Sequence, residues 1–217
     1  PAIGVAIYVA YRAMVPVVNI VGDHATYHRK YDPPLASDIE GLARPVSDWV
    51  RTSVDAASVG ADAAAAVQAA RMPPGRVATL VLPADASWNE GGRVAAPLAD
   101  PAFRPLDEAA IAAVARALRE VKPATIVLGH STLSERGLRA AARVSAATGA
   151  ALRTVGQVRR MARGRGRPAV DRIPYVLEKG LEVFRGVRGL VLVGAKPPVQ
   201  FFAYPGKPSL VHPPDAA

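Results

Sequence analysis

The sequence predicts an α/β protein in which two parallel sheets follow one another along the chain. Short apolar runs that are rich in β-branched residues alternate with segments of helical periodicity, an order typical of β-α-β units. Hydrophobic residues make up 50% of the 217 positions but aromatic residues only 6%, and much of the difference is alanine. Alanine lets helices pack close to a sheet, so the composition favours the same class.

The charge and cysteine content limit the classes of function. Lysine and arginine number 27 against 18 aspartate and glutamate residues, which gives a formal charge of +9. Such a charge can attract anionic ligands, nucleic acid or a membrane surface without distinguishing among them. The sequence contains no cysteine, which excludes disulfides, thiolate zinc sites and cysteine nucleophiles. A reducing compartment is therefore permitted, and we expect a cytoplasmic protein.

The first eleven residues, Pro1 to Tyr11, are nearly all apolar. Arg12 interrupts the run well short of the roughly 18 to 20 residues that a membrane span needs, and no basic segment precedes it, as a signal peptide would require. The segment predicts a buried helix or strand whose partner elements are absent. Because the sequence begins with proline, we expect it to be part of a longer protein.

The first half predicts a parallel crossover unit. Val15 to Val21 is a β-branched run that ends at Gly22-Asp23, the pattern of a buried parallel strand. A helix over 62–71 and a strand over 77–82 follow it, and two parallel strands require such a crossover. Between them, 35–42 predicts a short helix and 46–54 a weakly extended segment.

A change of composition marks the predicted domain boundary. Glycine and proline become frequent and periodicity is lost after Asp85, as in an extended connection between domains. The predicted organisation is a first domain over 1–90, a linker over 91–105 and a second domain over 106–217.

The second half predicts an open, doubly wound sheet. Asp107 is the predicted cap of a helix that buries one face, and Thr132 with Glu135 has capping-box spacing for a helix that runs to Gly149. The buried face of the first helix would consist of Ile111, Val114, Ala115 and Leu118. Strands are predicted over 124–128, 152–155 and 190–193, the last as the most buried, with a helix over 174–184.

The loop at positions 22–28 is the main candidate for a functional site. It carries Asp23, His24 and His28, and the four-residue spacing of the histidines would place both rings on one face of a helix. A metal site needs three or four converging ligands, and no His-Glu-x-x-His pattern is present, so we predict no metal site. The loop should line a pocket, because ligands of open parallel sheets lie beyond the carboxyl ends of the strands.

Three other motifs favour structural roles. Gly129-His130-Ser131 lacks the second glycine of a Gly-x-Ser-x-Gly nucleophile motif, so a tight turn with hydroxyl caps is preferred, although its backbone N–H groups could hold an anion. The arginine-rich segment from Arg159 to Arg167 has no interleaved aromatic residue to stack bases, which favours a solvated or subunit-facing loop over nucleic-acid binding. The aromatic residues of Phe201 to Lys207 predict a core or interface cluster, with a ligand platform as the alternative.

Several segments, in order along the chain, resemble a known family. The first half resembles the later part of the pyrimidine-binding domain of thiamine diphosphate enzymes, in the acetolactate synthase large-subunit-like branch. The second half resembles the Rossmann-like central domain of that branch. The segments that carry the resemblance are Val15 to His28, Asp38-Ile39, Arg44 to Ser47, Leu82 to Asp85, Ala146 to Gly149, Ile173 to Tyr175, Val193 to Pro198 and Phe201 to Lys207.

The resemblance implies three α/β domains, a homo-oligomer, and thiamine diphosphate held with Mg²⁺ at a subunit interface. The implied substrate is a small 2-oxo acid, joined or decarboxylated by a transferase or lyase, with no membrane or nucleic-acid partner. The implied pocket wall includes Gly22, Asp23, His24 and Tyr27, and His24 and His28 are the implied proton carriers. FAD is known in some relatives of the central domain, but nothing in this sequence supports it.

Two parts of the family's apparatus do not occur in these 217 residues. The family's catalytic glutamate should precede Arg12, yet Pro1 to Tyr11 has no acidic residue, and the metal-binding Gly-Asp-Gly segment would follow Ala217. We therefore predict that the chain alone does not catalyse the reaction. The alternative is a non-catalytic protein that binds a nucleotide or acyl-coenzyme A through its second sheet.

Overall fold

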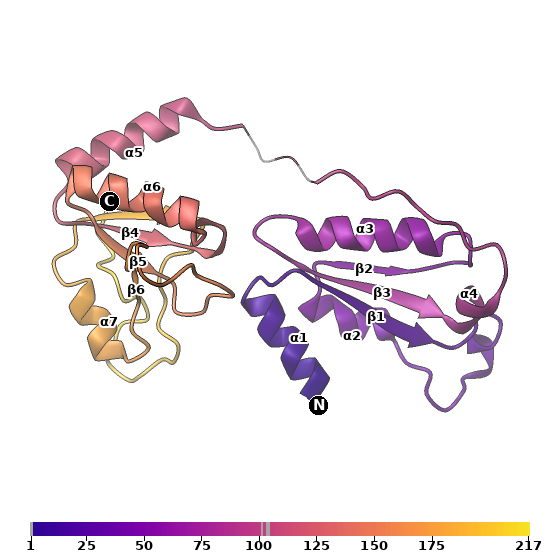
Figure 1. Cartoon of the computed structure of the whole chain (residues 1–217). Helices are drawn as coiled ribbons and strands as arrows, with labels where there is room; N and C mark the ends of the chain where they lie inside the picture. Colours follow the sequence, from indigo (N-terminus) through magenta and orange to yellow (C-terminus); the bar gives the residue numbers. More distant parts are fainter. Residues whose placement is uncertain (1, 101, 103–104) are drawn as a thin grey trace. The chain divides into compact units, whose positions relative to one another are not determined.

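The chain is an α/β protein with two parallel sheets, which confirms the predicted fold class (Figure 1). The computed structural model describes residues 2–100, 102 and 105–217. The chain consists of two compact units, Pro1–Phe103 and Arg104–Ala217. Among the described residues, no helix is both long and apolar enough to cross a membrane.

Unit 1 contains a three-stranded parallel sheet. Its strands are β1 (Val17–Asp23), β2 (Trp49–Thr52) and β3 (Val77–Pro83), in the order β1-β3-β2. The central strand β3 is almost completely buried. Residues 17–23 of β1 pair in register with 77–83 of β3, so both strands end at the same edge of the sheet. The crossover helix α3 (Val59–Arg71) covers one face, as the predicted β-α-β unit requires.

Small residues let α3 lie close to the sheet. Ala66 and Ala70 of α3 are buried against Ala78 and Leu80 of β3. On the opposite face of the sheet lie α1 (Ala2–Arg12) and the short helix α2 (Ile39–Ala43) (Figure 1). The sequence predicted this helix over 35–42, but it begins only at Ile39. The side chain of Asp38 accepts a hydrogen bond from the backbone N–H of Gly41 and caps the helix there.

The apolar first segment forms the helix α1. Pro1 itself lies outside the described residues. Val5, Tyr8 and Val9 are exposed, and the predicted burial of this segment against partner elements absent from these residues stays a prediction.

The predicted linker begins after a short helix. α4 (Ala84–Trp88) directly follows β3, and 91–100 then has no regular secondary structure. This stretch lies along α3: the Gln68 side-chain amide donates to the carbonyl of Ala99 at 2.8 Å, and Arg71 pairs with Asp100 at 2.7 Å. Residues 101, 103 and 104 of the predicted linker lie outside the described residues.

Unit 2 contains a four-stranded parallel sheet in the order β6-β5-β4-β7. Its elements are α5 (Glu108–Glu120), β4 (Ala124–Leu128), α6 (Glu135–Thr148), β5 (Ala151–Thr154), β6 (Asp171–Arg172), α7 (Leu177–Val183) and β7 (Gly189–Val193). The strand order reverses direction beside β4, as in a doubly wound sheet.

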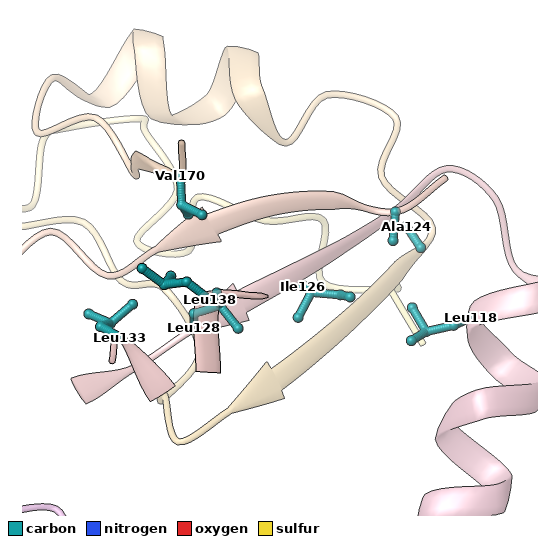
Figure 2. Close-up of a cluster of buried hydrophobic side chains, with 8 residues drawn as sticks. Leu118, Ala124, Ile126, Leu128, Leu133, Leu138 and Val170 are labelled. Carbon is teal, nitrogen blue, oxygen red and sulfur yellow. The ribbon is translucent and has the colours of Figure 1, made fainter. Parts of the chain in front are cut away.

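Alternate residues of β4 serve two cores, one on each face of the sheet. Ile126 and Leu128 pack with Leu133 and Leu138 on the side of α6, and Figure 2 shows this cluster. Val127 points to the opposite face, where it packs in the cluster that contains Phe184. All five residues of β4 are buried, whereas β7 lies at the edge of the sheet and is partly exposed. The prediction that 190–193 is the most buried strand is therefore wrong.

Two predictions about helices in unit 2 are also wrong in part. The cap of α6 is Ser134, whose hydroxyl accepts from the N–H of Gly137 at 3.2 Å, because Thr132 belongs to the preceding 3₁₀ turn (His130–Thr132). Asp107 caps α5 as predicted. However, Ile111 and Val114 of α5 are exposed and only Leu118 of its predicted face is buried. Leu118, near the C-terminal end of α5, packs in the core cluster on the sheet (Figure 2).

Candidate functional site

The candidate loop lies at the carboxyl edge of the first sheet, as predicted. Gly22 and Asp23 are the last two residues of β1 and pair with Leu82 and Pro83 at the end of β3. The chain then turns without forming an α-helix until a 3₁₀ turn over Arg29–Tyr31. The loop is therefore held between the ends of two adjacent parallel strands, where such sheets bind ligands.

Asp23 fixes the loop from within. One carboxylate oxygen accepts a hydrogen bond from the backbone N–H of His24 at 2.7 Å. The other pairs with the guanidinium of Arg29 at 2.8 Å. Because both oxygens are engaged inside the loop, Asp23 orients the backbone around His24.

A second carboxylate joins the loop to the helix after β3. The backbone N–H of Thr26 donates to Oδ1 of Asp85 at 3.0 Å, and its hydroxyl donates to Oδ2. These hydrogen bonds favour the ionised carboxylate, and they lower the pKa of Asp85 below its usual value. Neighbouring Ala25 is buried. The middle of the loop is thus anchored to α4.

The two candidate histidines lie close together. The ring centroids of His24 and His28 are 5.7 Å apart, and the planes meet at 61°. The ring of His28 also lies 6.1 Å from that of Tyr31. The helical face that the spacing suggested does not form, because the loop is a turn stabilised by a hydrogen bond from the N–H of His28 to the carbonyl of Ala25. The turn nevertheless brings both imidazoles together.

One cavity of about 750 Å³ includes every candidate residue of this loop. Gly22, Asp23, His24, Tyr27 and His28 line it from the side of β1. Ala25 of the loop also lines it. The opposite wall comes from the end of β3, from α4, and from the start of α2 with the segment before it; its residues are Leu82, Ala84, Ser87, Trp88, Leu35 and Ile39.

Sequence reasoning missed the far wall of this cavity. Ser87 and Trp88 lie on α4, just before the predicted linker, and Leu35 follows a Pro-Pro pair. One signal could have found α4, because the carboxyl end of β3 must lie beside that of β1 in a parallel pair. Within the described part of the chain, no group of three or more His, Asp or Glu residues could hold a metal ion.

The Gly129-His130-Ser131 turn of unit 2 is built for close packing. A Cβ atom on Gly129 would lie 1.7 Å from the carbonyl oxygen of Gly194, so only glycine fits. His130 is buried, and its Nδ1 has no hydrogen-bond partner among the described residues. Burial, followed by the charge of Arg159, lowers the pKa of His130.

The arginine-rich loop folds back on α6 of its own unit. Glu135 of α6 pairs with Arg139 at 2.8 Å and with Arg167 of the loop at 2.9 Å. Hydrogen bonds from these two guanidinium groups lower the pKa of Glu135. Part of the arginine cluster is thus used in an internal ion-pair network.

The aromatic segment forms an exposed cluster. The rings of Phe201 and Phe202 are 4.7 Å apart, and Tyr175 lies 5.2 Å from Phe201. All three side chains are exposed, so the cluster is not part of the core of unit 2, and the predicted interface and the alternative of a ligand platform stay predictions.

Comparisons with known proteins agree with this architecture. No protein-family model matches the chain. A Mycobacterium tuberculosis protein named "Putative acetolactate synthase large subunit IlvX" is 48% identical over 201 residues, which are 92% of this chain and 38% of the relative. The chain thus spans less than half the length of that relative.

Solved structures show the same fold. A Mycobacterium smegmatis protein described as a "putative thiamin diphosphate-dependent enzyme" matches with a TM-score of 0.75 and 22% identity, over 98% of this chain and 41% of that chain. The thiamine diphosphate-dependent 4-hydroxybenzoylformate decarboxylase of Rhodococcus jostii matches with a TM-score of 0.75 and 18% identity, over 99% and 41%. Over the matched residues, the predicted resemblance to the acetolactate synthase large-subunit-like branch of the thiamine diphosphate-dependent enzymes is therefore confirmed.

Proposed function

We propose that the cavity at the ends of β1 and β3 is one wall of the active site of a thiamine diphosphate-dependent enzyme that acts on 2-oxo acids. The observation that carries the proposal is the convergence of Gly22, Asp23, His24, Tyr27 and His28 on one cavity at the carboxyl edge of a parallel sheet. The 48% identity to a protein named as an acetolactate synthase large subunit supports carboligation or decarboxylation as the reaction.

The lining residues fit the pyrimidine end of the cofactor. Tyr27, Trp88, Ile39 and Leu82 offer apolar surface for a flat ring, and the imidazole of His24 offers hydrogen-bonding nitrogens. The diphosphate end, with its Mg²⁺, needs a cluster of oxygen ligands, and the described residues form none. The proposal therefore assigns only the pyrimidine side to this chain, with Mg²⁺ held by other parts of the assembled enzyme.

The residues of the loop have separate roles in this proposal. The chemistry that thiamine diphosphate supplies when bound is a carbon nucleophile for the carbonyl group of a 2-oxo acid. Asp23 orients the backbone at His24, and Tyr27 with Trp88 excludes water from the ring. His24 and His28 are the groups that hold or transfer a proton in the reaction.

A binding experiment tests the assignment to this chain. Purified chain with thiamine diphosphate and Mg²⁺ should show increased thermal stability, since a ligand at a hundred times its Kd stabilises a protein by about 2.7 kcal/mol. The same mixture should not consume pyruvate. Consumption of pyruvate by the chain without a partner would contradict its assignment as one wall of the site.

Variants of a full-length relative test the histidines. Glutamine at the positions of His24 and His28 keeps hydrogen-bonding groups but cannot carry a proton. Turnover should fall by a factor on the order of 10² if either group transfers a proton in the reaction. The matched control is His212→Gln in the second unit. Unchanged turnover in both loop variants would remove the proton-transfer role.

The proposal also includes the assembly that the resemblance implies. The enzyme would be a cytoplasmic homo-oligomer with the cofactor at a subunit interface, without FAD and without nucleic acid. Sedimentation of a full-length relative with and without thiamine diphosphate and Mg²⁺ measures the oligomeric state, and a monomer under both conditions would contradict this part.

A further inference from the structure

We infer that residues 91–100, which dock along α3, position the α4 wall of the cavity at the ends of β1 and β3, with Gly60 and Gln68 of α3 as the positioning residues. The inference rests on the function proposed above, because it concerns the same cavity. Residues 91–100 are called the strap. Neither Gly60 nor Gln68 lines the cavity, so both act on it only through the strap and α4.

The first observation is the close approach of the strap to the first turn of α3. A Cβ atom on Gly60 would lie 2.1 Å from the carbonyl oxygen of Arg93 and 3.3 Å from the backbone nitrogen of Ala95. Only glycine permits this contact, although glycine destabilises a helix relative to alanine. The glycine at position 60 therefore serves the contact with the strap and not the helix itself.

The second observation is a pair of polar contacts farther along the same helix. The side-chain amide of Gln68 donates to the carbonyl oxygen of Ala99 at 2.8 Å, and Arg71 pairs with Asp100 at 2.7 Å. Together with the contact at Gly60, they follow the same order along α3 and along the strap. The strap therefore has one defined path along the helix (Figure 1).

The strap is not held by buried apolar side chains. All of its residues are exposed except Ala95, which is half-buried. Its ion pair through Asp100 is exposed as well, and exposed pairs add little to stability. Segments with few buried contacts open locally while the rest of a protein stays folded. A change on α3 can thus release the strap without unfolding unit 1.

The third observation is the short connection between the strap and the cavity. α4 is five residues long, and its last two residues, Ser87 and Trp88, line the cavity. Only Asn89 and Glu90 separate α4 from the strap, which begins with a bend at Gly91, where φ is 99°. A helix as short as α4 is not stable alone, so its position depends on what holds its two ends.

The two ends of α4 are held by different groups. Near its start, Asp85 accepts hydrogen bonds from Thr26 of the loop after β1. Beyond its end, the chain continues into the strap on α3. Release of the strap leaves Trp88 fixed from one side only. Because a wall that is ordered before binding does not have to be ordered by the ligand, the docked strap favours tighter binding in the cavity.

Two glycine variants of the purified chain test this coupling. Gly60→Ala places a methyl group against the strap. Gly4→Ala is the matched control, since a Cβ atom on Gly4 in the first turn of α1 would meet no described atom within 4 Å. Hydrogen exchange followed by mass spectrometry should be faster in 84–88 and in 91–100 for Gly60→Ala, and unchanged for Gly4→Ala. Faster exchange in 91–100 with wild-type exchange in 84–88 would overturn the inference.

Trp88 reports directly on the wall. In a Trp49→Phe background, it is the only tryptophan of the chain. Its fluorescence anisotropy should fall in Gly60→Ala, because the side chain gains freedom when the strap is released. Anisotropy that stays at the wild-type value in Gly60→Ala would overturn the inference.

A second variant removes a strap contact without a clash. Gln68→Ala deletes the hydrogen bond to the strap and places a strong helix former in α3. We expect a smaller change in the anisotropy of Trp88, in the same direction as in Gly60→Ala. The control is Val67→Ala, an exposed neighbour on the same helix. An equal change in Gln68→Ala and Val67→Ala would remove Gln68 from the positioning residues.

The affinity for thiamine diphosphate with Mg²⁺ connects the strap to the site. Its Kd should rise about fivefold in Gly60→Ala, within the range that substitutions remote from a site produce. Circular dichroism and Tm should change little. A general loss of structure would lower Tm together with affinity, so this split separates positioning from misfolding. A wild-type Kd in Gly60→Ala, with a mobile Trp88, would overturn the role of the strap in the site.

The two proposals fail in different ways. If the wild-type chain binds thiamine diphosphate and Gly60→Ala matches it in exchange, anisotropy and Kd, the strap has no positioning role and the proposed function stands. If the wild-type chain does not bind thiamine diphosphate, the proposed function is wrong. The exchange of 84–88 and the anisotropy of Trp88 then decide alone whether the strap positions α4.

Discussion

Thr26 and Asp85 join two parts of the candidate site that are 59 positions apart in the sequence: the backbone N–H of Thr26 donates to Oδ1 of Asp85 at 3.0 Å, and its hydroxyl donates to Oδ2. Thr26 belongs to the loop after β1, and Asp85 belongs to α4 after β3. One carboxylate thus fixes the distance between the walls of the cavity. The two hydrogen bonds to this carboxylate also explain why the loop has a defined shape without being helical.

Removal of the Thr26 hydroxyl should loosen this connection. Thr26→Val keeps the shape of the side chain but leaves Oδ2 of Asp85 without its donor, so we expect a lower Tm and weaker binding of thiamine diphosphate. Thr26→Ser keeps the hydroxyl and is the control. If Thr26→Val and Thr26→Ser have the same Tm and affinity, the hydrogen bond does not hold the wall.

The pH dependence of the same variant follows from the pKa of Asp85. Hydrogen bonds from Thr26 lower this pKa in the folded state. The stabilisation is therefore present above the unfolded value of about 3.9 and is lost as the pH falls toward the folded pKa. Between about pH 5 and pH 3, wild type should lose more stability than Thr26→Val, and this difference can be measured by thermal unfolding. Parallel curves would contradict it.

The sequence predicted the strands and the place of the loop because these depend on local patterns. The run from Val15 to Val21 and the run from Val77 to Leu82 are each apolar and β-branched, and a helix lies between them. A parallel arrangement follows from that order alone. That arrangement predicts the edge of the sheet at which Gly22 to His28 lies, and no information on distant contacts is needed.

The remaining features depend on which elements become neighbours. Helical periodicity groups Ile111, Val114 and Leu118 on one face of α5, but only Leu118 reaches the sheet. Likewise, the apolar run of β7 does not reveal that β7 lies at an edge while β4 lies in the centre. Trp88 was missed for the same reason, since its place in the cavity depends on the pairing of β1 with β3.

His130 should make the stability of the second unit depend on pH near neutrality. Burial and the charge of Arg159 lower its pKa, so the unfolded chain binds more protons than the folded chain. Stability is then greatest above the unfolded value of about 6.5 and falls as the pH drops below it. His130→Gln should flatten the curve of Tm against pH in this range, with Ser131→Ala as the control. A variant curve that matches wild type would contradict this role.

The buried carboxylate of Asp62 should contribute more to stability than an exposed ion pair. Asp62 accepts a hydrogen bond from the hydroxyl of buried Ser53 at 2.9 Å and pairs with Arg51 at 2.9 Å. Asp62→Ala leaves that hydroxyl without a partner, which should cost about 1–3 kcal/mol. Asp100→Ala, which removes the exposed pair with Arg71, is the control and should change little.

Urea unfolding followed by tryptophan fluorescence measures this difference, because both tryptophans, Trp49 and Trp88, lie in unit 1 with Asp62. Equal losses of stability in Asp62→Ala and Asp100→Ala would show that the buried carboxylate contributes no more to the free energy of unfolding than the exposed one.

Leu128 and Ile20 give a direct test of the two strand environments. Leu128 is buried at the C-terminal end of β4, an inner strand of its sheet, where it packs with Leu133 and Leu138 (Figure 2). Leu128→Ala should therefore cost about 2–5 kcal/mol, since a cavity is left in a packed core. Ile20 is 64% exposed on β1, an edge strand among the described residues. Ile20→Ala removes a side chain of similar size from an exposed position, where little apolar contact is lost. The loss in free energy of unfolding, measured by urea unfolding followed by circular dichroism, should therefore be much smaller. A cost for Ile20→Ala that equals that of Leu128→Ala would mean that β1 is covered in solution, and the exposed face of unit 1 would then be an interface.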